Sequence, residues 1–471
     1  MRKLLLAAAC IALVGLAPCA YAVQVEVHGD LNHRAQVTDQ VNFFTHKVTP
    51  TYHTALDGVE GQYVDFKYRL WAEMASDDNA VKGVYAIEIG GIKFGDSANG
   101  GGYSGDGKNI ETRWAYTDFM LGNGRMKIGL QPWSVNSFVW TETATAIQYG
   151  ASAGMVDYEL GWARPKNYYP SSANKTDDDP FIEDADALMG RVNFGIGEGS
   201  KAGVFVLYQM SNPSKAAPGV ITANDWYVKD FGDVDMNIWT LGLDGKLQTA
   251  GPLFINWDVM FQTGQIDNVE FRDVAVDAND PAFSSIISPY NDYDLSAYFG
   301  HVDIGAKLGK LTLTYTGWYA SGDSKSDDDD FEAFLATDVD RTESIIFMEG
   351  GYPDEAAYTD RPYIADKGLF LNKVAADYQA TDKVKVGGAL LYLQLAEDIE
   401  YTDDLNVARS SKDLGFEVDA YISYQMYKNL EIALNAGYLL SGDAMDVFEN
   451  TTDGAADEDV FRTTAKIEYK F

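Results

Sequence analysis

The sequence predicts an all-β fold, a transmembrane antiparallel β-barrel of about eighteen strands, from three observations. Apolar and polar residues alternate with a period of two in many segments, as they do along a strand that separates two environments. Short and long connections alternate along the chain. After residue 22, no segment approaches the roughly 20 consecutive apolar residues that a membrane-spanning helix needs.

The first 22 residues have the pattern of a secretory signal peptide. Two basic residues precede an apolar run over 4–16, and the Ala-Tyr-Ala sequence of 20–22 offers a cleavage site. Both cysteines, Cys10 and Cys19, lie in this leader, so the exported chain would have no thiol for a disulfide, a metal or nucleophilic catalysis. We therefore expect one barrel domain over residues 23–471.

The end of the chain shows the alternation most clearly. Phe461, Ile467 and Tyr469 fall on one face of a predicted strand, and Arg462 and Lys466 fall on the other. Other segments share this pattern, with apolar residues at every second position: 23–28, 311–316 and 430–438. A helical period is hard to find after the leader.

The connections sort into eight short turns and nine long loops. The turns, rich in turn-forming residues, lie at 77–79, 122–124, 151–154, 197–200, 250–251, 309–310, 381–382 and 428–429. The loops cover roughly 38–60, 96–109, 132–141, 166–185, 213–235, 267–290, 323–367, 398–412 and 443–458. This count gives eighteen strands, with short periplasmic turns and both termini at one end and long external loops at the other. Sixteen strands are the alternative, if two pairs merge.

Aromatic residues support a membrane setting. The chain has 29 tyrosines and 9 tryptophans, and many lie near predicted strand ends, where a membrane–water boundary favours amphipathic rings. Examples are Tyr63, Trp71, Tyr158, Trp162, Trp257, Tyr319, Tyr378, Tyr438 and Tyr469. Aromatic residues are also common in ordinary strands.

The formal net charge of −35 excludes a nucleic-acid partner, which would need a basic surface. Two acidic runs in long loops could hold Ca²⁺ or Mg²⁺, which prefer oxygen ligands; the simpler interpretation is a solvated surface. These runs are Asp177, Asp178 and Asp179, and Asp327, Asp328, Asp329 and Asp330. We expect no other cofactor.

An enzymatic role is not expected. The five histidines are His28, His33, His46, His53 and His301. None lies beside a serine in an evident catalytic constellation, which a barrel hydrolase would need.

The last eleven residues, 461–471, resemble the C-terminal signature of outer-membrane proteins, and this resemblance implies that the barrel-assembly machinery recognises Phe471. Residues 109–121, 125–133 and 161–165 resemble the homotrimeric porins of sulfate-reducing bacteria. That resemblance implies an integral outer-membrane protein in contact with lipid and lipopolysaccharide. It further implies a homotrimer in which each subunit passes small hydrophilic solutes and ions passively.

The same resemblance implies that a loop at about 132–146 folds inward and narrows the pore. Its candidate residues are Trp133, Asn136, Phe138, Trp140 and Glu142. Since Glu142 is the single acidic residue between 133 and 146, the charge of the constriction is left open.

Alternation assigns a set of charged residues to the water-filled interior, because Lys or Arg on the lipid face costs roughly 2–4 kcal/mol near the midplane. These candidates are Lys67, Arg69, Glu73, Arg125, Lys127, Arg191, Glu417, Asp419, Arg462, Lys466 and Glu468. Acidic loops at the entrance should favour cations mildly. The alternatives are a substrate-selective channel for a sugar or ion, and a surface or adhesive β-protein that transports nothing.

Overall fold

A computed structural model describes most of the barrel. The described residues are 23–39, 61–97, 100–103, 110–166, 185–212, 235–267, 292–325, 328–339, 341, 343–347, 366–402, 407–444 and 459–471. The predicted leader therefore lies outside them. No helix in this part of the chain is long and apolar enough to cross a membrane.

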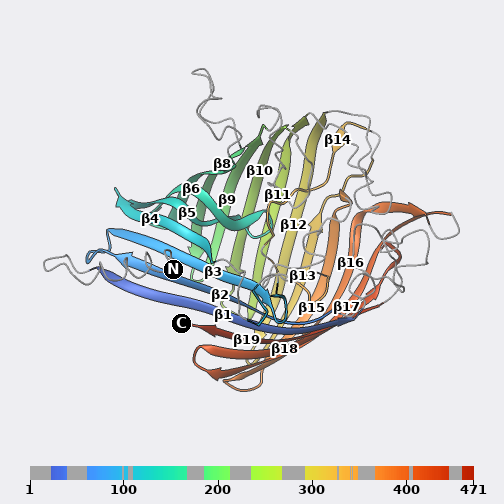
Figure 1. Ribbon diagram of the computed structural model, residues 1–471. Coiled ribbons are helices and arrows are strands. Elements are labelled where there is room, and N and C mark those ends of the chain that lie inside the picture. The colour runs from blue at the N-terminus through green and yellow to red at the C-terminus, as the bar shows by residue number, and fades with distance from the viewer. Residues whose placement is uncertain are drawn as a thin grey trace.

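The structure is an antiparallel barrel of eighteen strands with one additional two-residue strand, β14 (Figure 1). The strands are β1 Gln24–Asp39, β2 Gly61–Ala75, β3 Val81–Lys93, β4 Glu111–Leu121, β5 Gly124–Asn136, β6 Trp140–Ala153, β7 Val156–Lys166, β8 Ala185–Gly197, β9 Ser200–Ser211, β10 Asp235–Gln248, β11 Leu253–Asp267, β12 Tyr293–Leu308, β13 Leu311–Ala320, β14 Asp330–Phe331, β15 Leu369–Gln379, β16 Val384–Thr402, β17 Ala408–Tyr427, β18 Leu430–Ser441 and β19 Val460–Lys470. The prediction of eighteen strands is confirmed.

The barrel closes where β1 pairs with β19. Asp30 lies opposite Lys470, and the pairing continues to Asp39 opposite Phe461. The backbone amides and carbonyls of Gly29 and Phe471 also exchange two hydrogen bonds of 3.0 Å. Closure leaves neither β1 nor β19 as a free sheet edge, which is the condition for a β-sheet to span a membrane.

The period-two pattern separates an apolar outer face from a polar inner face. On β19, Ile467 and Tyr469 are 44% and 39% exposed on the outside, whereas Arg462 is 3% exposed on the inside. Outward-facing aromatic residues include Tyr319, Tyr378 and Tyr438. Tyr63 and Trp71 lie on the inner face instead: Arg34 stacks over the Tyr63 ring, and Trp71 packs against Trp114.

The eight predicted turns join β-strands at one end of the barrel. Gly122 and Gly309 occupy the left-handed region, with φ of 63° and 64°, as tight hairpin turns require. The turn predicted at 151–154 lies slightly later, because β6 continues to Ala153 and β7 starts at Val156.

The outer face generates a stability prediction. Ala465→Lys, exposed on the outer face at the centre of β19, places a charge toward lipid and should lower the free energy of unfolding by about 2–4 kcal/mol. Urea titration in lipid vesicles, followed by the shift between folded and unfolded gel bands, measures this change. Lys466→Gln, on the inner face of the same strand, should have a much smaller effect. Equal losses would contradict the assignment of the two faces.

Candidate functional site

The ends of β5 and β6 leave the barrel wall and enter its interior. β5 pairs with β4 only up to Leu130, and β6 pairs with β7 only from Ala146 onward, while β5 and β6 continue to pair with each other. We call residues 131–145 the inner hairpin; Figure 1 shows it crossing the barrel. The region predicted as an inward-folded loop is thus mostly a β-hairpin.

The tip of the inner hairpin packs against the far wall. The Phe138 ring is fully buried, and its centroid lies 4.7–4.9 Å from those of Phe299, His301 and Trp318. The Asn136 amide donates a 2.7 Å hydrogen bond to Asp258 on β11. This contact places the hairpin on the side of the barrel formed by β10–β13.

The position of the Trp133 ring, at the base of the hairpin, depends on a glycine of β7. A Cβ atom at Gly161 would lie 2.7 Å from the Trp133 ring, so only a residue without a side chain allows this approach. Trp133 is fully buried and lies 5.4 Å from Trp140. Glu142, farther from the tip, pairs with Arg113 on β4 at 2.6 Å.

A second part of the chain lies in the interior. We call residues 328–339, 341 and 343–347 the inner segment. It begins with β14, which pairs in parallel with β12. The Leu335 amide donates to the Gln262 side chain, whose amide donates to the Leu335 carbonyl, both at 2.8 Å. This part of the connection predicted at 323–367 is therefore fixed against β11 and β12.

The inner hairpin and the inner segment meet. The backbone N–H groups of Thr337 and Asp338 both donate to the Val139 carbonyl, at 2.8 and 3.0 Å. The Arg341 guanidinium lies 5.0 Å from the centre of the Phe138 ring. The two insertions thus form one internal layer that covers β10–β13, and residues 343–347 extend it to β17–β19.

An acidic group with a histidine lies behind this layer. His301 Nδ1 is 2.8 Å from Asp258, and Nε2 is 3.2 Å from Asp303. Arg341 pairs with Glu343 at 2.9 Å and approaches Asp303 at 3.8 Å. Because both ring nitrogens face carboxylates, the geometry suits a ring with two N–H donors.

The opposite wall carries cations with acidic neighbours. Arg34 pairs with Asp65 at 3.0 Å, and Lys67 pairs with Glu88 at 3.1 Å. Arg69 also bonds Glu88. We call these cations the cationic wall: Arg34 on β1, Lys67 and Arg69 on β2, and Arg113 on β4, which also contacts the inner hairpin through Glu142.

The charged residues predicted for the interior fall into two groups. Arg191, Glu417, Asp419 and Arg462 contact the inner hairpin or the inner segment. The others lie on the cationic wall or toward the short turns: Lys67, Arg69, Glu73, Arg125, Lys127, Lys466 and Glu468. Their role as pore lining stays a prediction.

Sequence reasoning missed Asp258, Asp303 and Glu343. A signal was available for Asp303, because alternation places it on the same face as His301, two residues away. Glu343 had no such signal, since it lies in a connection whose path depends on contacts with β15 and β17.

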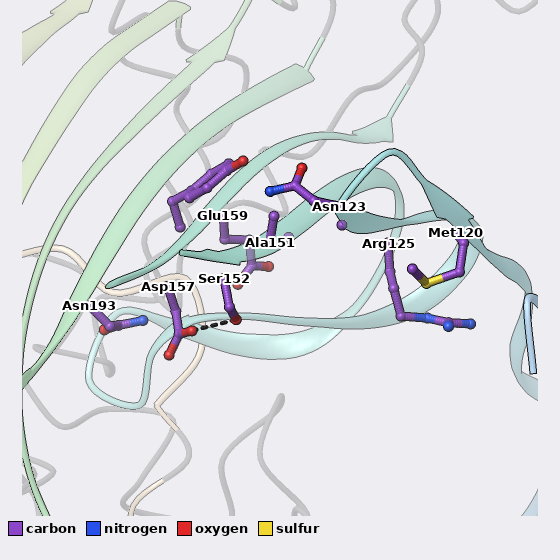
Figure 2. A pocket seen from close by; sticks show the side chains of 11 residues that line it. Met120, Asn123, Arg125, Ala151, Ser152, Asp157, Glu159 and Asn193 are labelled. Carbon is purple, nitrogen blue, oxygen red and sulfur yellow. Dashed lines mark hydrogen bonds between the residues drawn. The ribbon is translucent and has the colours of Figure 1, made fainter. Parts of the chain in front are cut away.

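A cavity of about 390 Å³ lies on the inner wall near the short turns. Figure 2 shows Arg125 toward one side of it and Asp157 with Asn193 toward the other. Ser152 donates to Asp157 at 2.5 Å. The cavity is lined by residues of β4–β8 beside the short turns.

Of the two acidic runs, the structure describes Asp328, Asp329 and Asp330. Asp177, Asp178, Asp179 and Asp327 lie outside the described residues. Asp328 pairs with Lys325 at 3.8 Å, and its side chain accepts a hydrogen bond from the Asp330 amide. Within the described ranges, no three His, Cys, Asp or Glu side chains are grouped to hold a metal ion.

Phe138→Ala should loosen the contact between the two insertions, because a buried phenylalanine contributes about 3–5 kcal/mol of packing. Amide hydrogen exchange of Thr337 and Asp338, which donate to Val139, should accelerate. Phe370→Ala, on the outer face of β15, is the control and should leave these amides unchanged. Equal exchange in both variants would contradict the packing described here.

Asp323 generates a pH prediction. Burial raises its pKa to about 6, outside the spanning strands, so the folded chain holds a proton there that the unfolded chain loses near pH 4. The local stability should therefore fall as pH rises from about 4 to about 6. Exchange of the Phe334 amide, which donates to Ser321, measures this after correction for intrinsic rates. Asp323→Asn should remove the dependence; a variant that retains it would assign it to another group.

The sequence matches no protein-family model and no curated protein. Solved structures match nearly the whole chain. Pseudomonas aeruginosa OccK8 (OprE) has 11% identity and a TM-score of 0.51, covering 95% of this chain and 98% of that one. Pseudomonas aeruginosa OpdL has 9% identity and a TM-score of 0.51, covering 95% and 99%.

A BenF-like porin from Pseudomonas fluorescens Pf-5 has 9% identity and a TM-score of 0.50, covering 96% of this chain and 100% of that one. These likenesses support an outer-membrane porin fold. They give no support to the narrower resemblance to the homotrimeric porins of sulfate-reducing bacteria.

Proposed function

We propose that this chain is an outer-membrane channel through which small hydrophilic solutes and ions diffuse passively. The observation that carries the proposal is a closed eighteen-stranded barrel with a charged inner face. A barrel of 16–18 strands is wide enough for an aqueous channel rather than a packed core. Solutes in such a channel are filtered by diameter and by the charge of the wall.

The passage runs beside the cationic wall. The internal layer occupies the side of β10–β13, where the His301 side chain is 1% exposed. On the cationic wall, the Arg69 and Arg113 side chains are 32% and 26% exposed. Solvent therefore reaches these guanidinium groups, which supports a path along β1 and β2, beside the Arg113–Glu142 pair that joins β4 to the inner hairpin.

Charge is distributed unevenly across this path. Arg34, Lys67, Arg69 and Arg113 stand on one side, partly balanced by their acidic partners. Asp258, Asp303 and Glu343 lie toward the other side, where Arg341 and Lys373 partly balance them. A field across the bore would orient dipolar solutes, since low-dielectric walls strengthen it.

A substrate-selective channel is the second candidate. The aromatic contacts of Phe138 and the backbone contacts of Leu335 fill part of the interior, which makes the bore narrower than the barrel alone. A narrow bore with fixed charges favours selection among solutes. A surface or adhesive protein that transports nothing would not need solvent-exposed charges inside a closed barrel.

The remaining expectations belong to the same proposal. They are export by the leader at 1–22, recognition of Phe471 by the barrel-assembly machinery, and insertion among lipid and lipopolysaccharide. A homotrimer and divalent ions in the acidic external loops are also proposed. A gel of the unheated, detergent-extracted protein tests the folded barrel and its oligomeric state together.

Liposome swelling with sugars of graded size tests the channel. We expect small sugars to enter and larger ones to be excluded, because the internal layer narrows the bore. Strong inhibition by one solute at low concentration would favour the selective channel. Liposomes that swell no faster than protein-free ones would contradict both.

Reversal potentials in a potassium chloride gradient test ion preference. We expect a mild preference for potassium, since the chain carries a formal net charge of −35. The preference should weaken in concentrated salt, because the screening length falls to about 3 Å at 1 M. A preference for chloride would show that the cationic wall dominates the acidic entrance.

A further inference from the structure

Glu417 on β17 holds three consecutive backbone N–H groups of the inner segment. Its fully buried carboxylate accepts from Ile345 at 3.0 Å, Ile346 at 2.8 Å and Phe347 at 3.1 Å. Asp419, 5% exposed, also accepts from the Ile345 amide, at 3.2 Å. Successive N–H groups that converge on one carboxylate form an anion-binding nest, and such charge-assisted bonds are strong.

Two further residues of the wall contact the same part of the inner segment. Arg462 on β19 donates to the Ile345 carbonyl at 3.2 Å. On β18, a Cβ atom at Gly437 would lie 3.0 Å from Ile345 Cβ and from Ile346 Cγ1. The absence of a side chain at Gly437 therefore allows the inner segment to lie directly on the wall.

Residues 343–347 are fixed by side chains of the wall and belong to no strand. The strands β17, β18 and β19 keep their own continuous pairing beneath them. Loss of the contacts with Glu417 would therefore move this part of the inner segment without opening the barrel. The position of residues 343–347 can change while the wall keeps its stability.

The contacts that hold residues 343–347 on the wall are linked to the inner hairpin. Glu343 pairs with Lys373 on β15 at 3.2 Å and with Arg341 at 2.9 Å. Arg341 in turn lies over the Phe138 ring at the hairpin tip. A shift at 343–347 can thus be transmitted to the residues that border the bore.

We propose that Glu417 and Asp419 are positioning residues that set the width of the bore, by clamping residues 343–347 against β17–β19. This inference rests on the proposed channel function. Replacing the acceptor of Glu417 by an amide removes its charge and brings an N–H₂ donor against backbone N–H donors. Residues 343–347 should then leave the wall and change the cross-section open to ions.

Single-channel recording of Glu417→Gln tests the clamp. We expect a conductance changed by about 1.5-fold or more, with more frequent transitions between levels, because the bore sets the flux. Glu198→Gln, the same chemical change in the β8–β9 turn, should match the unsubstituted protein. Glu417→Asp keeps the charge but shortens the side chain, so its change in conductance should be smaller than that of Glu417→Gln. This variant also provides the test if Glu417→Gln does not fold.

A substitution at Gly437 supplies an independent test. Gly437→Ala adds the Cβ atom that would lie 3.0 Å from Ile345 Cβ and Ile346 Cγ1, so it should displace residues 343–347 from the wall without changing any charge. Gly300→Ala on β12 is the control, because a Cβ atom there would have no neighbour within 4 Å. Gly437→Ala should change the conductance as Glu417→Gln does, whereas Gly300→Ala should conduct like the unsubstituted protein.

The outcomes separate this inference from the proposed function. If Glu417→Gln, Glu417→Asp and Gly437→Ala all conduct like the unsubstituted protein, the clamp is wrong while the channel stands. If the unsubstituted protein conducts no ions, the proposed function fails first.

Discussion

Closure of the β1–β19 pairing is the constraint on which the rest of the structure depends. It leaves neither terminal strand as an open edge, so the barrel can present an apolar outer surface without unpaired amides. It also creates an enclosed interior in which charged residues can remain hydrated. Because the wall uses most of its own backbone groups, the inner hairpin and the inner segment also take side chains of the wall as hydrogen-bond partners. This explains why Gln262, Arg191 and Glu417 bond backbone atoms of these two insertions.

The interior combines two kinds of packing. On the side of β10–β13, Phe138, Phe299, Trp318 and Phe334 form a dry aromatic cluster of the kind expected in a soluble core. On the other side, cations and carboxylates keep contact with solvent. Burying charged groups without partners would be costly, and the pairing of Arg34 with Asp65 and of Lys67 with Glu88 avoids that cost. The barrel therefore places packing and hydration on opposite sides of one lumen.

Period-two alternation was sufficient to predict the strands and the face of residues such as Lys67 and Lys466, because a strand fixes side-chain direction locally. The alternation of short turns with long loops predicted the number of strands. It was not sufficient for the internal layer. The contact of Asn136 with Asp258 joins residues 122 positions apart, and nothing in either local pattern specifies it. The inner segment was assigned to a long external connection, although Phe331, Phe334 and Leu335 form an apolar group within an acidic stretch. Such a group in a connection is a usable signal for insertion into a barrel.

The contact between the Val139 carbonyl and the amides of Thr337 and Asp338 has a consequence for folding order. Its two sides are separated by almost two hundred residues, and six strands lie between β6 and β13. Contacts of such high sequence separation form late, since the chain between them must first be ordered. The hairpin tip would therefore stay undocked, with its aromatic residues exposed, until β12 and β13 have paired with the rest of the sheet. If this docking is delayed or fails, the barrel wall would be closed but the internal layer would not be formed.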